Sequence, residues 1–378
     1  MVRKRIKLTM RKHLTYLFIA SVLMNGCDKY NDVQSSASGE DYITLKLDVA
    51  TTTKSLINPD AQTLNFNTIG SKIILYDVFT AGDGQTSAEL TQYLDEQNLL
   101  YDGLDWIFTK SQSNNEEVKI PWTKTGGHDF FAHNSYDAAS GLEIPYEVGY
   151  SSFEDNAVAN TIGKHQYFQV PASGTLQMTT HDNQFDFLYS SHYRDIAIDG
   201  FKPVEMDFKH LFAAVYFEVK NISSSVMKLN SFSLGGIKDI GSAKIAYNGD
   251  VALTLSASSQ SSLFAETPNR QLKVGEAEII YDDCGAGKAI LIWPHSAANF
   301  ANASFTLKYN LARNSSATSW YSENVATVPL SGAESPYKVN NWAAGTVYKY
   351  NITVSDNNIS LSVTRVVDWI NDDVILEE

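Results

Sequence analysis

The chain has 378 residues and a formal net charge of −14, with 43 acidic and 29 basic residues. Its length suffices for about two domains that each bury a core. The acidic excess would repel the phosphates of nucleic acid, so it excludes nucleic-acid binding and indicates a protein kept soluble outside the cell.

Residues 1–26 have the pattern of a bacterial lipoprotein signal peptide. A cationic stretch without acids, Arg3 to Lys12, precedes the apolar run Leu14 to Met24, which is too short to span a bilayer. Gly26 and Cys27 follow, and a small residue directly before a cysteine resembles a lipobox. We therefore expect acylation of Cys27, with palmitate among the acyl chains, to anchor the chain to a membrane. The alternative is an ordinary secretory signal with an incidental cysteine.

The chain has two cysteines, Cys27 and Cys284. If Cys27 is acylated, no intrachain disulfide is possible, and the core and strand ladders must stabilise the fold. Cys284 has no flanking histidine or basic cluster, which favours a strand-end or turn position over a reactive thiol. The polar, serine-rich residues 27–40 are typical of a tether.

A strand is predicted at the start of the folded region. Ile43 to Val49 alternates strictly between apolar and polar residues, which is typical of a strand with one buried face. The apolar face consists of Ile43, Leu45, Leu47 and Val49. A polar break follows this strand and carries the basic residue Lys54.

Two further elements are predicted in the next fifty residues. Ile73 to Phe79 is a short apolar run, which indicates a buried strand. Thr86 to Leu100 is predicted to be a helix, because Thr86 and Glu89 have the spacing of a capping box and apolar residues recur at helical intervals. Those apolar residues are Leu90, Tyr93 and Leu94.

The chain beyond Phe201 has a nearly continuous strand pattern. Asn248-Gly249 lies between two alternating segments, which predicts a hairpin. Tyr348 to Val354 and Ile359 to Val363 alternate on either side of a polar turn. Many short alternating strands predict an all-β fold built of antiparallel β-sandwiches, with a minor helix in the N-terminal half. We place one sandwich domain at residues 41–200 and a second at residues 201–378.

The histidines form no recognisable metal or catalytic motif. His128 and His133 are the closest pair, yet no carboxylate or third histidine lies at helical spacing, so a loop or core position is favoured over metal binding. His210 alternates with apolar residues and is predicted to point inward and to be hydrogen-bonded. No nucleophile with an adjacent base is evident, so we expect no enzyme activity, no metal and no cofactor.

Several segments carry a family resemblance through their order and spacing. They are Trp122 followed by Asp129-Phe130-Phe131-Ala132, Phe185-Asp186-Phe187-Leu188 followed by Met206 to Val215, Ile292-Trp293-Pro294-His295, Trp342 to Val354, and Asp368-Trp369. Together they resemble the Bacteroidetes fimbrillins, the FimA-like and Mfa-like pilins. The resemblance covers nearly all of the chain after the signal peptide. Its departures, His295 and Lys54 in place of more usual residues, concern the subtype.

The resemblance implies two tandem transthyretin-like sandwich domains and a structural subunit or accessory component of a cell-surface pilus (fimbria) that serves adhesion. It also implies assembly with other pilin subunits by strand exchange. A protease would cut after Lys54, the strand at 43–49 would leave, and a neighbouring subunit's strand would fill the groove. Ile43, Leu45, Leu47 and Val49 would be the pocket-filling side chains. The lipid would hold the chain at the outer membrane, and a host or bacterial surface receptor would be a further partner.

An alternative interpretation is a non-polymerising surface lipoprotein that binds glycans through exposed aromatic residues. The chain has 20 tyrosines and 6 tryptophans, which could build a sugar-stacking face. Aromatic side chains are also common in strands for structural reasons. Trp342, Tyr348 and Tyr350, for example, are expected to close one end of a domain and to stack across strands.

Overall fold

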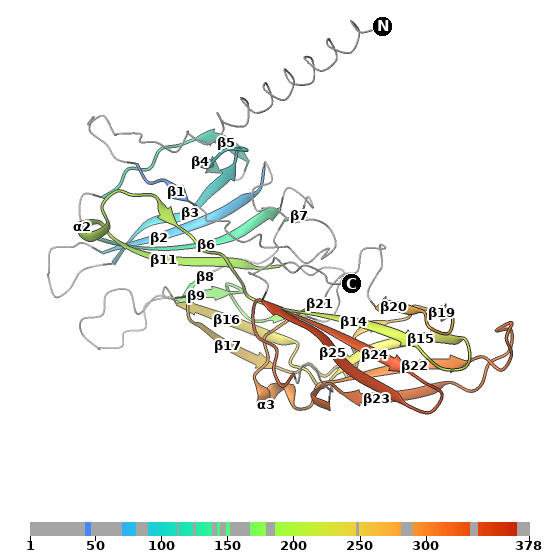
Figure 1. Ribbon diagram of the computed structural model, residues 1–378. Helices are drawn as coiled ribbons and strands as arrows, with labels where there is room; N and C mark the ends of the chain where they lie inside the picture. Colours follow the sequence, from blue (N-terminus) through green and yellow to red (C-terminus); the bar gives the residue numbers. More distant parts are fainter. Residues whose placement is uncertain are drawn as a thin grey trace, which may run out of the picture. The chain divides into compact units, whose positions relative to one another are not determined.

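The computed structural model describes residues 42–46, 70–80, 90–111, 113–123, 126–137, 142–143, 149–151, 167–178, 186–246, 249–280, 290–332 and 339–368. These residues form β-strands with a few short helices (Figure 1), and most neighbouring strands are antiparallel. The predicted all-β class is therefore confirmed. Its finer description as two tandem transthyretin-like sandwiches stays a prediction, as does the division at residue 200.

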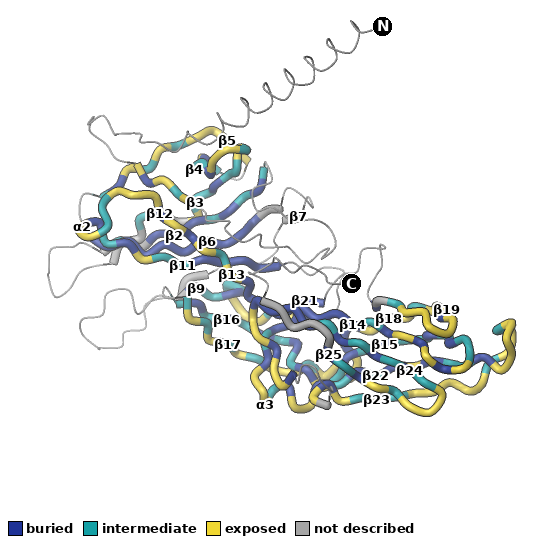
Figure 2. Tube along the Cα trace, viewed as in Figure 1, coloured by how far each residue is buried: buried dark blue, intermediate teal, exposed yellow. Residues whose placement is uncertain are grey.

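The first large sheet has eight strands in the order β13-β11-β6-β2-β3-β4-β5, with β7 paired to β6. The strands are β2 (Lys72–Thr80), β3 (Leu90–Tyr101), β4 (Trp106–Ser111), β5 (Asn114–Glu117), β6 (Gly127–Asp137), β7 (Leu142–Glu143), β11 (Leu188–Asp195) and β13 (Lys209–His210). Strands β2 and β6 are largely buried (Figure 2), because each of them has a hydrophobic core on both faces. Phe131 packs in the first core and Phe130 packs in the second core. Burial on both faces explains the continuous apolar run at Ile73 to Phe79, whose predicted strand is confirmed.

The predicted helix over Thr86 to Leu100 is wrong, because the chain from Leu90 onward forms strand β3. Its pairing with β2 contains register shifts, with Asp77 opposite Leu94 and Leu75 opposite Gln97. Each extra residue in a bulge shifts the alternation of faces by one position. Apolar residues thus recur at mixed spacings that imitate helical intervals. Residues 86–89 of this prediction lie outside the described residues.

The second sheet combines strands from both halves of the chain. Its order is β10-β16-β9-β8, with β17 paired to β16. The strands are β8 (Gly149–Ser151), β9 (Tyr167–Val170), β10 (Leu176–Gln177), β16 (Ile240–Ala246) and β17 (Val251–Ser256). The predicted hairpin is confirmed, since Ile245 pairs with Val251 and Gly249 has the positive φ of 82° that such turns need. This sheet packs on the first through Phe131 and Phe168, whose ring centroids are 3.8 Å apart.

Two further five-stranded sheets contain most of the other strands. One has the order β20-β14-β24-β25 with β21 on β14, and the other has β18-β15-β22-β23 with β19 on β15. The strands are β14 (Ala213–Asn221), β15 (Met227–Gly235), β18 (Leu263–Glu266), β19 (Arg270–Leu272), β20 (Ala277–Ile280), β21 (Ile290–Ile292), β22 (Ser304–Leu311), β23 (Asn324–Pro329), β24 (Thr346–Val354) and β25 (Ile359–Asp368). Short helices are α2 (Ile196–Asp199), α3 (Ala297–Phe300) and η1 (Leu330–Gly332).

The facing sheets bury aromatic side chains between them. Phe217 on β14 stacks on Tyr350 of β24 at 5.2 Å and contacts Phe232 of β15 at 4.8 Å between ring centroids. Trp342 is buried and donates its Nε1–H to the Tyr350 hydroxyl at 3.0 Å. The Tyr348 hydroxyl accepts the backbone N–H of Ala343 at 2.8 Å. The core that contains these residues is continuous with Phe131 and Phe168 of the first half.

Candidate functional site

The first described segment, Tyr42–Lys46, lies between two other parts of the chain. On one side, the Ile43 N–H donates to the Ile120 carbonyl at 2.7 Å, and Tyr42 forms an antiparallel bridge with Pro121. On the other side, β1 (Leu45–Lys46) pairs in parallel with β12 (Val204–Glu205). The Val204 N–H donates to Thr44 O at 2.8 Å, and the Met206 N–H donates to Lys46 O at 3.1 Å. We call Tyr42–Lys46 the leading segment.

Side chains of the leading segment alternate between the core and the solvent. Ile43 is buried in the second core and Leu45 packs against it, whereas Thr44 and Lys46 are exposed. That core includes Leu75, Leu99, Trp106, Phe108, Trp122, Phe130, Val204 and Met206. Burying an aliphatic side chain stabilises the folded state by about 1.5–3 kcal/mol relative to leaving it exposed. The role of Ile43 and Leu45 as pocket fillers stays a prediction, and Leu47, Val49, Lys54, Cys27 and Cys284 lie outside the described residues.

The segment that pairs with Tyr42 and Ile43, residues 118–123, is fastened to the first sheet by side chains. The Tyr93 hydroxyl donates to the Pro121 carbonyl at 2.6 Å. The Thr123 Oγ1 lies 2.7 Å from Nε2 of His128, and Nδ1 of the same ring lies 2.5 Å from Oδ2 of Asp77. These contacts make the segment a fixed wall beside the leading segment.

The buried carboxylates near this wall have perturbed acidities. Burial raises the pKa of Asp77, while the hydrogen bond from His128 and the charge of that ring lower it. Burial, followed by the charge of Asp77, raises the pKa of Asp129 to about 7. Burial and the charge of Asp77 also raise the pKa of Tyr93. The region therefore holds buried acids whose ionisation the fold penalises.

Thr123, His128 and Asp77 follow the order nucleophile, base and acid, but their surroundings are those of a core. His128 and Asp77 have no exposed side-chain area. The His128 ring is enclosed by four aromatic rings at centroid distances of 5.1–5.7 Å, namely Phe79, Tyr93, Trp122 and Phe130. A general base must come within hydrogen-bond reach of a substrate proton, and this enclosure prevents such an approach. His128 and Asp77 support the wall through Thr123.

The opposite neighbour of the leading segment is held by a buried arginine. Arg194 on β11 pairs in register with His128 on β6, and its Nη2 donates to the Pro203 carbonyl at 2.7 Å. Pro203 directly precedes β12. At the surface of β12, Lys46 Nζ lies 3.2 Å from Glu205 Oε1, and both side chains are more than half exposed. Both neighbours of the leading segment are thus anchored to the first sheet. The charged side chain of Lys46 on the leading segment is exposed to solvent.

His210 and His133, which were also considered in the sequence analysis, are buried core residues. His210 is buried and its Nδ1 lies 2.7 Å from Oδ2 of Asp186, which confirms the prediction that it points inward and is hydrogen-bonded. His133 donates from Nδ1 to the Asn134 carbonyl at 2.9 Å, and burial lowers its pKa to about 4. No group of three potential metal ligands occurs among the described residues.

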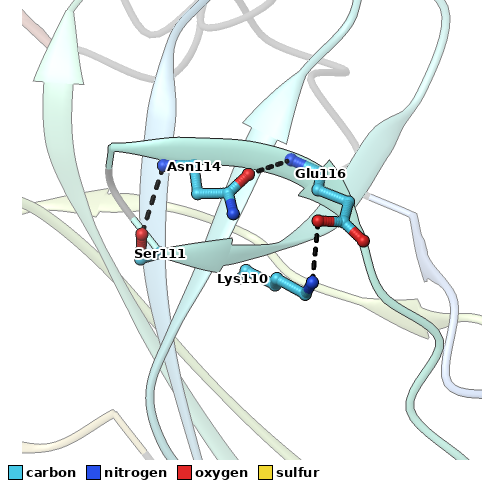
Figure 3. Close-up of polar contacts among 4 residues, drawn as sticks. All are labelled: Lys110, Ser111, Asn114 and Glu116. Atoms are coloured by element: carbon cyan, nitrogen blue, oxygen red, sulfur yellow. Dashed lines mark hydrogen bonds and ion pairs between the residues drawn. The ribbon is translucent and has the colours of Figure 1, made fainter.

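The far edge of the first sheet contrasts with the leading segment. All four residues of β5 are exposed. Figure 3 shows how the β4–β5 hairpin satisfies its own polar groups, with Lys110 Nζ 2.7 Å from Glu116 Oε2. The Asn114 N–H donates to Ser111 Oγ at 3.1 Å, and the Glu116 N–H donates to Asn114 Oδ1 at 3.0 Å. Charged, self-bonded edges of this kind resist pairing with another chain.

The contacts of this site join residues that are far apart in the sequence. Asp77 and His128 are separated by 51 positions, and no local pattern links them. Arg194 also gave no sequence signal, because an isolated arginine in an alternating strand is most often exposed. None of the helices in the part of the chain that the structure describes is long and apolar enough to cross a membrane.

Comparisons with known proteins give one family match. The model of a family described as fimbrillin-like matches residues 65–369. Among solved structures, a fimbrial protein from Bacteroides vulgatus is 14% identical, with 87% of this chain and 99% of that chain covered and a TM-score of 0.47. A candidate cell adhesion protein from Bacteroides ovatus is 15% identical, with 89% and 100% covered and a TM-score of 0.45. A search of curated proteins found no match.

Proposed function

Because this chain belongs to the fimbrillin-like family, we propose that it is a structural subunit or accessory component of a cell-surface fimbria and serves adhesion. In this proposal it is exported as a lipoprotein, and it is assembled with other pilin subunits by strand exchange. Cys27 carries the lipid that attaches the precursor to the outer membrane. The proposal assigns the chain no catalytic step.

The position of the leading segment is the observation that carries the assembly proposal. It pairs on both sides through its backbone and inserts Ile43 and Leu45 into the second core. Its removal would leave the Ile120 carbonyl and the N–H groups of Val204 and Met206 without partners, beside an apolar pocket. Unpaired backbone next to apolar pockets is what an added strand recognises. A strand from another subunit could therefore replace it.

The neighbours of the leading segment are suited to receive such a strand. Residues 118–123 are held by Tyr93 and His128, and β12 is held by Arg194. An acceptor that keeps its shape avoids the ordering penalty of binding, so it binds a strand more tightly than a flexible one would. Cleavage after Lys54, which lies between the leading segment and the first strand of the large sheet, would free the leading segment without cutting that sheet.

The proposal is tested by treating purified residues 28–378 with a protease that cuts after basic residues. We expect SDS-resistant oligomers that appear only after cleavage, with Ser55 as the first residue of the assembled chains. Lys54→Gln should abolish both the cleavage at this site and the oligomers, whereas Lys72→Gln on β2 serves as a matched control. Oligomers that retain residues 28–54 would contradict release of the leading segment. Fatty-acid labelling that survives Cys27→Ser would contradict the lipid anchor.

A further inference from the structure

The neighbours of the leading segment fix the direction in which a strand can occupy its place. The leading segment is antiparallel to residues 120–121 and parallel to β12. Parallel and antiparallel ladders place their hydrogen bonds differently. A strand that entered in the reverse direction would have to exchange these two patterns, and it would lose the registers that join Thr44 and Lys46 to Val204 and Met206 and that join Ile43 to Ile120.

The same arrangement fixes which residues of an incoming strand face the core. Positions 43 and 45 point into the second core, and positions 44 and 46 face solvent. A shift by one residue would turn the apolar side chains outward. A replacing strand therefore needs apolar side chains at the two positions equivalent to Ile43 and Leu45.

The position equivalent to Lys46 faces two exposed acidic residues, Glu205 and Asp207, which we call the acidic rim. Lys46 lies directly opposite Glu205 in the β1–β12 register, and the two charges are 3.2 Å apart. Glu205 and Asp207 are both exposed, because they alternate with the buried Val204 and Met206. When the leading segment leaves, the positive charge of Lys46 leaves with it, and the rim of β12 becomes more acidic.

The charges of this rim also affect the pKa of His192 on β11. Burial and the nearby charge of Arg194 lower the pKa of His192, while the charges of Asp199, Glu205 and Asp207 oppose that shift. The guanidinium of Arg194 is itself buried and donates to the Pro203 carbonyl, whereas the carboxylates of Glu205 and Asp207 are exposed. Like charges directly opposite one another destabilise a strand pair, and opposite charges stabilise it.

We propose that the vacated groove selects a partner strand that runs in the direction of the leading segment and carries Lys or Arg opposite Glu205, after two inward-facing apolar residues. The inference rests on the proposed function, because it names the chemistry of the strand that the exchange would accept. Glu205 is then a specificity-determining residue, and an acidic strand is discriminated against by the rim.

Labelled peptides can test this selection on the intact chain. A site for a sequence-specific protease is inserted between Thr53 and Lys54 of residues 28–378, and the cut protein is mixed with fluorescent peptides of the sequence 41–50. The peptides carry Lys, Arg, Gln or Glu at position 46, and one further peptide carries Tyr42→Cys and is offered to an acceptor with Pro121→Cys and Cys284→Ser. The acceptors are the native chain, Glu205→Gln and Glu205→Lys, with Glu116→Lys on exposed β5 as the control. Fluorescence anisotropy at low and high salt measures binding.

We expect the Lys and Arg peptides to bind the native acceptor equally, and the Glu peptide to bind about tenfold more weakly at low salt. High salt should reduce this difference, since both charges are exposed. Glu205→Gln should remove the preference and Glu205→Lys should reverse it, while Glu116→Lys should leave it unchanged. Equal binding of the Lys, Arg, Gln and Glu peptides to the native acceptor would overturn the charge selection but leave strand exchange intact. Binding of the Tyr42→Cys peptide without a disulfide to the Pro121→Cys acceptor would overturn the direction, because these two positions are bridge partners only in the native direction. Failure of every peptide to bind would instead contradict the proposed function.

Discussion

The imidazole Nδ1 of His128 lies 2.5 Å from Oδ2 of Asp77, and neither side chain has any solvent-exposed area. The pair joins β6 to β2, and through Nε2 of His128 it reaches Thr123 in the wall beside the leading segment. A structural pair at the centre of the first sheet is thus also the support of the candidate site.

Removal of the acidic partner should destabilise the fold. Asp77→Ala leaves the buried imidazole N–H without its acceptor, and we expect the free energy of unfolding to fall by about 3–5 kcal/mol. Asp77→Asn keeps an acceptor oxygen and should lose less. Urea unfolding followed by circular dichroism measures both variants, with Glu117→Gln on exposed β5 as a control that changes stability by less than about 0.5 kcal/mol. A loss as small as the control's would contradict this role of the pair.

Asp129 should destabilise the protein at neutral and alkaline pH. Burial and the charge of Asp77 raise its pKa from 3.8 to about 7, so the folded state holds a proton that the unfolded state releases. The resulting penalty is absent below pH 3.8, grows as the pH rises, and is constant above about pH 7. Asp129→Asn should therefore raise the free energy of unfolding at pH 8 by roughly 2–4 kcal/mol. A gain that is independent of pH between 4 and 8 would contradict this assignment.

His133 should contribute to acid sensitivity with the opposite sign. Burial lowers its pKa from 6.5 to about 4, and the hydrogen bond to the Asn134 carbonyl only partly opposes this shift. The unfolded state gains a proton below pH 6.5 whereas the folded state gains it near pH 4, so the stabilisation is full above 6.5 and is lost as the pH falls toward 4. The loss amounts to roughly 3 kcal/mol.

His133→Asn places an amide donor near the position of Nδ1 and removes the titration. The variant should show a shallower decline of unfolding free energy between pH 7 and pH 4, measured by denaturant titration at each pH. An unchanged decline in His133→Asn would show that other groups cause the acid sensitivity.

Tyr350 should matter through its hydroxyl as well as its ring. Tyr350→Phe keeps the stacking on Phe217 but leaves the buried Trp342 Nε1–H without its acceptor. A buried unsatisfied donor costs about 1–3 kcal/mol, which a thermal or urea transition resolves. Tyr321→Phe removes a hydroxyl from an exposed tyrosine and is the matched control. Equal stability of the two variants would show that the hydrogen bond contributes nothing.

The strands that could be predicted from the sequence are those with regular alternation or a clear turn signal. The hairpin at Gly249 and the strand at Tyr348 to Val354 follow from local patterns, and the structure confirms both. The prediction for the segment that forms β3 failed because bulges break the period of two in this strand. One of these bulges places Glu96 at a positive φ of 49°. Bulges depend on the partner strand, which a pattern within one segment does not record.

The candidate site could be predicted only in part. Alternation placed Ile43 and Leu45 on one face, and the structure turns both toward the second core. The wall and its supports could not be predicted, because Tyr93, His128 and Asp77 are brought together by the order of strands in the sheet. Pairing across a sheet is a long-range property, so chemistry that depends on it leaves no spacing signature.

Release of the leading segment is the central claim, and a reversible covalent lock tests it most directly. Tyr42 and Pro121 are bridge partners, and opposite residues in an antiparallel pair lie about 4.5–5.5 Å apart at Cα, within the range of a disulfide. Tyr42→Cys and Pro121→Cys are combined in residues 28–378 with Cys284→Ser, which removes the remaining native cysteine, and Tyr42→Cys with Cys284→Ser alone is the control. After protease treatment, we expect the oxidised double variant to remain monomeric and to form SDS-resistant oligomers only when reductant is added, whereas the control forms them in both conditions. Oligomers that form equally well from the oxidised, locked protein would contradict assembly by departure of the leading segment.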